Sequence, residues 1–303
     1  KEVIGQDNAI ESVSDSLKRS VVGINDPGKP VGSFLFLGCT GVGKTHLSKM
    51  LAENMFGSKE DIVQIDMSEM MESHSVSKLI GSPPGYVGYG KGGKLTEYIR
   101  KNPYSLVLFD EVEKAHPDVL NILLQILEEG KVTDSNGRNI NFRNTVIVMT
   151  TNVGAERIQQ PVPIGFVNPD TIEDKNKFVH DTALEEVKKH FKPEFLNRID
   201  DLIVFNNLGE KELEKIVQLN FKDYIKRAKA QHSVTLKLNK SAVDLILKEG
   251  YDEKFGAREI KRTIKKLFET RYATDLLSGK IPKQSTVSVG ARNKKLTLTV
   301  STE

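Results

Sequence analysis

The segment from residue 38 to residue 45 reads Gly-Cys-Thr-Gly-Val-Gly-Lys-Thr, which is the spacing of a phosphate-binding loop. An apolar run at residues 34–37 precedes it, and a helical pattern that includes Leu47 and Leu51 follows it. This order predicts a strand, a glycine-rich turn and a helix whose N-terminus brings partial positive charge to bound phosphate. A turn without a ligand is the alternative, and the flanking pattern argues against it. We therefore expect a nucleoside triphosphate to bind here.

Each position of this loop has a defined task in such a site. Glycines let the backbone N–H groups of Gly41, Val42 and Gly43 surround phosphate oxygens. Lys44 can reach the β- and γ-phosphates, and the Thr45 hydroxyl can bind Mg²⁺. The expected ligands are therefore ATP and Mg²⁺.

A second chemical motif lies at residues 106–111, which read Leu-Val-Leu-Phe-Asp-Glu. Four apolar residues in a row are typical of a parallel strand that is buried on both faces, and ligands bind at the C-terminal ends of such strands. Asp110 is then placed as a partner of Mg²⁺, and Glu111 can polarise a water for attack on the γ-phosphate. An acidic pair at a strand end is common by itself. Combined with the phosphate-binding loop, it predicts hydrolysis rather than binding alone.

The composition argues against several other classes of protein. The 303 residues carry a net charge of +3 with basic residues spread along the chain, which gives no basis for a nucleic-acid partner. No apolar run approaches the ~18 residues of a membrane span. The single cysteine, Cys39, excludes disulfides within the chain and favours a reducing compartment, the cytoplasm or an organellar matrix or stroma. Because residue 1 is a lysine rather than a methionine, we expect a fragment of a longer protein.

Alternating strands and helices predict an α/β fold with a mostly parallel sheet, followed by a smaller and mainly helical part. A helix is expected at 117–129, where apolar residues recur on one side. The expected strands are residues 33–37, 62–66, 105–109, 145–149 and 202–205. Beyond residue 206 we expect helices to about residue 230, at 241–249 and at 257–278, and short β runs at 286–289 and 296–300. We therefore predict a nucleotide-binding domain at 1–206 and a small α-helical (α+β) domain at 207–303.

Residues 81–93 contain six glycines and two prolines, so they are expected to form a loop rather than a helix or strand. The loop nevertheless contains bulky residues, among them Tyr86 and Val87. We interpret it as a mobile arm that contacts something apolar, such as an extended polypeptide. A loop folded back on its own domain is the alternative.

Two further segments bear on partners. Asn136-Gly137 between two short β-type runs predicts a hairpin over 131–141, either a second substrate contact or a purely structural element. A long polar insertion is expected at 153–180, and it contains Ile164-Gly165-Phe166. That tripeptide is a candidate docking peptide, and a local hydrophobic contact that holds the loop is the alternative.

Together these motifs resemble the second AAA+ module of the Clp unfoldases, hexameric ring ATPases that thread protein chains through a central pore. The likeness extends over essentially all 303 residues. It implies an AAA+ P-loop large domain with a small domain, hydrolysis of ATP with Mg²⁺, and assembly into a homo-hexamer. It also implies unfolded or tagged proteins as substrates, and adaptor proteins bound through N-terminal parts outside this sequence.

The resemblance implies roles for individual residues at the start of the chain and in the loop at 81–93. Val3 and Ile4 would pack on adenine. Tyr86 and Val87 would form the pore loop that contacts the translocating chain. Cys39 stands where a proline is usual in this family, which removes no reacting group.

The same resemblance implies three roles around the γ-phosphate. Asn152 would help to position the attacking water. Arg198 would be an arginine finger that acts on the nucleotide of a neighbouring subunit. Arg258 would reach the γ-phosphate from the small domain.

An aliphatic-Gly-Phe tripeptide such as Ile164-Gly165-Phe166 resembles the element with which this family docks on a ClpP-type peptidase. The tripeptide favours a protease-coupled unfoldase over two alternatives. One is a protease-independent disaggregase of similar architecture, which would lack the tripeptide. The other is an AAA+ nucleic-acid motor or clamp-loader subunit, against which the near-neutral charge argues.

Overall fold

The computed structural model describes residues 2–23, 26–85, 92–155, 157, 172–252 and 256–301, with the backbone alone for 172–178. These residues form two compact units. One unit comprises Gln6–Cys39 and Gly43–Asn206, and the other comprises Asn207–Glu303 with Lys1–Gly5 and Thr40–Val42. We propose the domain boundary between residues 206 and 207 on this basis.

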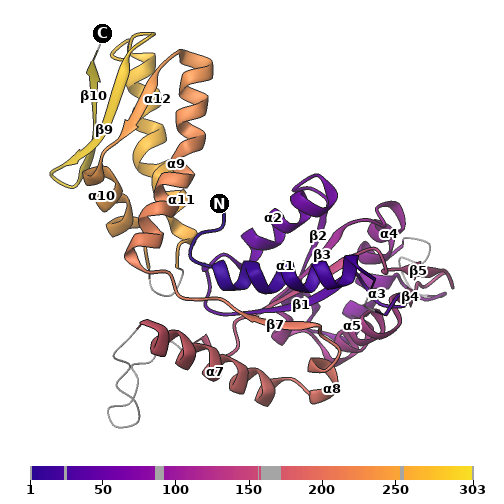
Figure 1. The fold of residues 1–303 in the computed structure, drawn as a ribbon. Coiled ribbons are helices and arrows are strands. Elements are labelled where there is room, and N and C mark those ends of the chain that lie inside the picture. Colours follow the sequence, from indigo (N-terminus) through magenta and orange to yellow (C-terminus); the bar gives the residue numbers. More distant parts are fainter. Residues whose placement is uncertain are drawn as a thin grey trace. The chain divides into compact units, whose positions relative to one another are not determined.

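A five-stranded parallel sheet forms the centre of the first unit, in the order β2-β3-β6-β1-β7 (Figure 1). Each expected strand is present with its ends moved by no more than two residues, so the predicted α/β class is confirmed. The strands are β1 (Gly32–Leu37), β2 (Ile62–Asp66), β3 (Leu106–Asp110), β6 (Val146–Thr151) and β7 (Asp201–Val204). All six residues of β1 and of β6 are buried, as expected for strands covered on both faces.

Helices and short turns connect these strands. The helices are α1 (Asp7–Val21), α2 (Lys44–Phe56), α3 (Val76–Ile80), α4 (Lys94–Lys101), α5 (Pro117–Glu129), α7 (Ile172–His190) and α8 (Pro193–Leu196). The predicted hairpin is confirmed as β4 (Lys131–Thr133) and β5 (Asn139–Asn141). His116 has a structural role at the start of α5, where its Nδ1 accepts a hydrogen bond from the backbone N–H of Asp118 at 3.2 Å.

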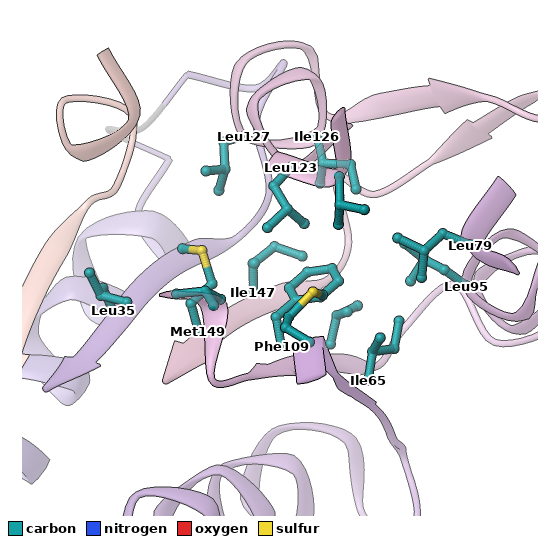
Figure 2. Close-up of a cluster of buried hydrophobic side chains, with 14 of the residues drawn as sticks. Leu35, Ile65, Leu79, Leu95, Phe109, Leu123, Ile126, Leu127, Ile147 and Met149 are labelled. Carbon is teal, nitrogen blue, oxygen red and sulfur yellow. The ribbon is translucent and has the colours of Figure 1, made fainter. Parts of the chain in front are cut away.

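One face of the sheet is covered by a continuous hydrophobic core (Figure 2). Leu123, Ile126 and Leu127 of α5 lie in the same cluster as the strand residues Phe109 and Met149. Each of these side chains is at most 2% exposed. This packing fixes the strands along their length, and so fixes the positions of the polar residues that follow their C-terminal ends.

The polar insertion expected at 153–180 is shorter than predicted, because α7 begins at Ile172. The C-terminal half of α7 holds the helix in the core through Ala183 and Val187, which are both fully buried. Ala183 and Val187 lie beyond the polar residues 153–180, so the start of α7 inside that stretch was not predicted. Ile164-Gly165-Phe166, like Tyr86 and Val87, lies outside the described residues.

The start and the end of the first unit are joined by one side chain. Gln6 is fully buried, and its Nε2 donates to the backbone carbonyl of Asn206 at 2.9 Å. Its Oε1 accepts from the backbone N–H of the same residue, also at 2.9 Å. The amide of Gln6 therefore pairs with Asn206 as a neighbouring strand would.

The second unit combines helices with a small sheet. Its elements are α9 (Glu210–His232), β8 (Thr235–Leu238), α10 (Lys240–Gly250), α11 (Arg258–Ile264), a π-helical segment (Lys265–Glu269), α12 (Thr270–Leu277), β9 (Thr286–Arg292) and β10 (Lys295–Ser301). The predicted helices and the two closing β runs are present. The strand β8 was not predicted, and it pairs in parallel with β9, which pairs antiparallel with β10.

Candidate functional site

Three neighbouring strand ends bring the predicted reacting residues together. In the sheet β6 lies between β1 and β3. The phosphate-binding loop follows β1, Asp110 ends β3, and Asn152 comes directly after the last residue of β6. Asn152 is therefore placed between Lys44 at the start of α2 and the acidic end of β3.

The backbone of the loop is left-handed at two of its glycines. Gly41 and Gly43 have φ angles of 78° and 111°, in the left-handed region that favours glycine. Gly43 is the N-cap of α2 and makes no side-chain cap hydrogen bond with the described residues, and the first turn of the helix contains no acidic residue. The N-terminus of a helix carries partial positive charge, so this end of α2 suits an anion.

Lys44 is only 8% exposed, and its ammonium group is held by three acceptors. Nζ donates to the carbonyl of Gly38 at 2.5 Å, to that of Cys39 at 3.0 Å and to Oδ1 of Asn152 at 2.8 Å. Burial lowers the pKa of Lys44 from 10.5 to about 8, against the opposing effects of Cys39 and the nearby carboxylates. A phosphate at this position would supply the negative charge that the buried ammonium group lacks.

Asp110 is oriented by two neighbouring strands. Its Oδ1 accepts a hydrogen bond from the Thr150 hydroxyl on β6, and its Oδ2 accepts from Nε2 of Gln64 on β2 at 3.0 Å. Thr150 Oγ1 in turn accepts from the backbone N–H of Glu111 at 3.1 Å. One threonine thus fixes the carboxylate of Asp110 and the backbone of the residue after it.

Glu111 is engaged through both carboxylate oxygens. It has a φ of 58°, which is uncommon for a residue with a side chain. Its Oε1 accepts from Nδ2 of Asn152 at 3.2 Å, and its Oε2 pairs with Nζ of Lys114 at 2.6 Å. The hydrogen bond to Glu111 raises the pKa of Lys114. These contacts hold the carboxylate of Glu111 beside Asn152, where it is a candidate general base.

Asn152 connects the two halves of the site. Its side-chain oxygen accepts from Lys44 and its side-chain nitrogen donates to Glu111. Its backbone N–H donates to Oε1 of Glu113 at 3.2 Å. The chain Lys44–Asn152–Glu111 joins the phosphate-binding loop directly to the candidate base.

Sequence reasoning missed three residues that orient this site: Thr150, Lys114 and Glu113. Thr150 directly follows the apolar run at 146–149, near the end of β6, where a hydroxyl gives no separate signal of an orienting role. Lys114 and Glu113 follow Asp110-Glu111 within four residues, so the density of charge after β3 was the available signal.

The residues present fit an Mg²⁺ ion that is bound partly by the protein and partly by phosphate oxygens. Within the described residues, no group of three or more His, Cys, Asp and Glu side chains is arranged to hold a metal ion. Mg²⁺ is commonly held by one or two protein ligands, with phosphates and waters completing an octahedron. Asp110 and the partly buried Thr45 are oxygen donors of this type.

The other predicted site residues lie apart from this cluster in the chain. Arg198 is 24% exposed, and its guanidinium contacts Glu128 at 2.9 Å and Glu194 at 3.3 Å. Arg258 is the first residue of α11 and is exposed. Val3 and Ile4 are partly buried.

Across the ranges that the structure describes, no helix has both the length and the apolar character needed to cross a bilayer.

Comparison with known proteins gives a family match for each of the two units. Residues 29–202 match the model of the AAA domain (Cdc48 subfamily), and residues 208–289 match the C-terminal, D2-small domain, of ClpB protein. The chain is 50% identical over 292 residues to a chaperone protein ClpB of Oceanobacillus iheyensis, covering 96% of this chain and 36% of the relative. It is 50% identical over 281 residues to the negative regulator of genetic competence ClpC/MecB of Bacillus subtilis, covering 93% and 34%.

A plant relative shows the same pattern. The mitochondrial chaperone protein ClpB4 of Arabidopsis thaliana is 47% identical over 287 residues, which cover 95% of this chain and 29% of the relative. The chain thus spans about a third of the length of these relatives. The family match covers more than half of the chain and includes the loop, the acidic strand and Asn152. The chain therefore belongs to the AAA family of nucleotide-binding ATPases and, with its matching small domain, is a second AAA+ module of the Clp type.

Proposed function

We propose that this chain is the ATP-hydrolysing motor module of a ring-shaped Clp unfoldase, which threads protein substrates through a central pore. The observation that carries the proposal is the hydrogen-bonded chain from Lys44 through Asn152 to Glu111. It supports the proposal because it holds the ammonium group of Lys44 and the carboxylate of Glu111 on the two sides of one amide. A site built only to bind nucleotide would not need the base.

In the proposed mechanism each residue performs one task. The N–H groups of Gly41, Val42 and Gly43 and the ammonium group of Lys44 bind the phosphates of ATP. Thr45 and Asp110 would hold Mg²⁺, which neutralises charge on the phosphate oxygens when it is bound. The positive φ angles of Gly41 and Gly43 and the burial of Lys44 support this list of ligands.

Glu111 acts as the general base that takes a proton from the attacking water. Asn152 orients that water together with Glu111. Each carboxylate oxygen of Glu111 accepts one hydrogen bond from the described residues and keeps a second lone pair for the water, and the contact with Lys114 is the more exposed of the two. The bond to Asn152 would keep the carboxylate in place.

Two arginines complete the proposed motor. Arg198 serves as the finger for a neighbouring subunit of a homo-hexamer, and Arg258 serves as a second sensor of the γ-phosphate. A guanidinium suits both tasks, because its fixed donors match phosphate oxygens. The resemblance to the Clp unfoldases supports these roles, and also the packing of Val3 and Ile4 on adenine.

The proposed substrates are unfolded or tagged proteins, contacted by Tyr86 and Val87, and a ClpP-type peptidase is the proposed partner. Ile164-Gly165-Phe166 supports the peptidase. The second candidate is a protease-independent disaggregase, which the name ClpB of several relatives favours. In either case, adaptors would bind through parts of the protein outside this chain.

The deciding experiment measures degradation of a stably folded, tagged substrate by the full-length protein with a ClpP-type peptidase. Replacing Ile164-Gly165-Phe166 with three alanines should abolish degradation and leave ATPase activity and unfolding intact. Tyr86→Ala should keep the ATPase activity and lose unfolding. Val162→Ala, a change two residues earlier in the sequence, is the matched control.

Different failures have different meanings in that experiment. Undiminished degradation by the triple-alanine variant would remove the docking role. Unfolding without degradation by the unaltered protein would establish the disaggregase. Normal unfolding by Tyr86→Ala would remove the pore-loop role.

Nucleotide affinity should fall as the pH rises above about 8, because Lys44 has a pKa of about 8 in the nucleotide-free chain. Bound phosphate favours the charged ammonium group and raises that pKa, so binding above pH 8 requires uptake of a proton. The dissociation constant should then rise by up to about tenfold per pH unit. Calorimetry in buffers of different ionisation enthalpy measures the proton directly. Lys44→Met should bind weakly and show no such uptake, and a pH-independent affinity of the unaltered chain between pH 7 and pH 9.5 would contradict the assignment.

A further inference from the structure

Glu113 is partly buried, and only one of its two carboxylate oxygens has a hydrogen-bond partner among the described residues. Its Oε1 accepts a hydrogen bond from the backbone N–H of Asn152 at 3.2 Å. Its Oε2 is buried and has no hydrogen-bond partner among the described residues. A buried carboxylate oxygen without a partner lowers stability, so packing alone does not explain the residue.

The position of Glu113 is fixed by the turn that carries it. Residues Val112–Lys114 form a 3₁₀ turn directly after Glu111. Val112 in this turn is fully buried in the core. The backbone N–H of Lys114 donates to the carbonyl of Glu111 at 3.0 Å. Because Val112 anchors the turn, the carboxylate of Glu113 is held on the site side.

Asn152 depends on such a fixed support. It follows β6, so its own backbone lies beyond the last residue of the strand. Its side-chain amide must still meet Lys44 at 2.8 Å and Glu111 at 3.2 Å at the same time. A small rotation of its backbone would change the geometry of both bonds at once, because Oδ1 and Nδ2 belong to the same planar group.

We propose that Glu113 is a positioning residue for hydrolysis, which holds the backbone of Asn152 and thereby sets where its amide meets Lys44 and Glu111. This inference rests on the proposed ATPase mechanism. Glu113 itself contacts neither the phosphates nor the water in this proposal. It acts through Asn152, and its removal should mimic a displaced Asn152.

The test compares Glu113→Ala, Asn152→Ala and the double variant. In the full-length protein, Glu113→Ala should lower kcat about tenfold or more, since small displacements of reacting groups have effects of up to ~10²-fold. KM for ATP should change much less. The loss in the double variant should equal the loss in Asn152→Ala alone, because the two residues act as one unit.

A second readout does not depend on activity. In the nucleotide-free chain, the backbone N–H of Asn152 should exchange with solvent at least ~10-fold faster in Glu113→Ala, because its acceptor is gone. Glu113→Gln keeps an oxygen of the same shape and should keep the slow exchange. Glu129→Ala, at the exposed end of α5, is the matched control and should change neither readout.

Additive losses in the double variant would overturn the inference, as would unchanged exchange at Asn152 in Glu113→Ala. A drop in melting temperature that accounts for the lost activity would assign Glu113 a structural role instead. If the unaltered protein hydrolyses no ATP, the proposed function fails, while the exchange measurement still tests the contact between Glu113 and Asn152.

Discussion

Glu111→Gln should bind ATP with nearly unchanged affinity and hydrolyse it at least ~10²-fold more slowly, the effect expected for loss of a general base. The amide of glutamine keeps the size of the side chain and keeps an oxygen that can accept from Nδ2 of Asn152. Lys44 keeps all three of its present acceptors. The change removes the negative charge that attracts the proton of the water, and with it the exposed ion pair with Lys114.

Two measurements separate binding from chemistry in this variant. Single-turnover hydrolysis reports the chemical step, and equilibrium binding of ATP reports the affinity. Glu72→Gln, an exposed glutamate on the same unit, is the matched control and should leave both unchanged. Hydrolysis within about threefold of the unaltered protein would show that Glu111 is not the base.

Arg198→Ala should reduce hydrolysis by ~10³-fold or more, because an arginine finger contributes 10³–10⁵ to kcat. The defect should belong to the neighbouring subunit and not to the subunit that carries the change. Mixing Arg198→Ala with Glu111→Gln tests this directly, since each inactive protein holds the part that the other lacks. An Arg198→Ala subunit has an intact base, and a Glu111→Gln neighbour supplies an intact finger. Activity should therefore appear on mixing.

The control for this experiment changes a residue that Arg198 contacts in the structure. Its guanidinium pairs with Glu128 and Glu194, both more than half exposed, so these ion pairs contribute little to stability. Glu128→Gln should leave the ATPase activity within about threefold. If the mixture stays inactive although mixed rings form, or if Arg198→Ala alone keeps full activity, the trans-acting role is wrong.

The parts of the fold that were predicted have strong local signals. Phe34 and Phe36 in β1 and Leu106 and Leu108 in β3 belong to apolar runs too short for helices, so the central strands were readable. The parts of the fold that were not predicted, such as α1, have weak local signals. The buried residues of α1 are Ala9, Val13 and Ser16, which are too small or too polar to mark an apolar side.

Strand β8 was not predicted for a different reason. It has only four residues, and its alternation rests on Leu236 and Leu238 alone. Its identity as a strand comes from pairing with β9, about fifty residues later in the chain. A partner that distant contributes nothing to the local pattern, so no reading of residues 235–238 alone could establish the pairing.

The residues of the site were likewise predictable from local motifs, whereas their arrangement was not. Lys44, Asp110 and Glu111 were predicted because each motif stands within a few residues of sequence. Their mutual geometry was not predictable, because it depends on β6 lying between two strands that are far apart in the chain. Only that order of strands allows one amide, that of Asn152, to reach both Lys44 and Glu111.

The pairing of Gln6 with Asn206 determines how the parallel sheet can be isolated as a separate protein. A chain shortened to begin beyond residue 6 would leave the backbone N–H and carbonyl of Asn206 without the amide that now binds them. Gln6 is therefore part of the smallest piece that can be expressed with this edge intact. Where an experimenter truncates the gene is thus set by a single glutamine, two hundred residues away from the segment that it completes.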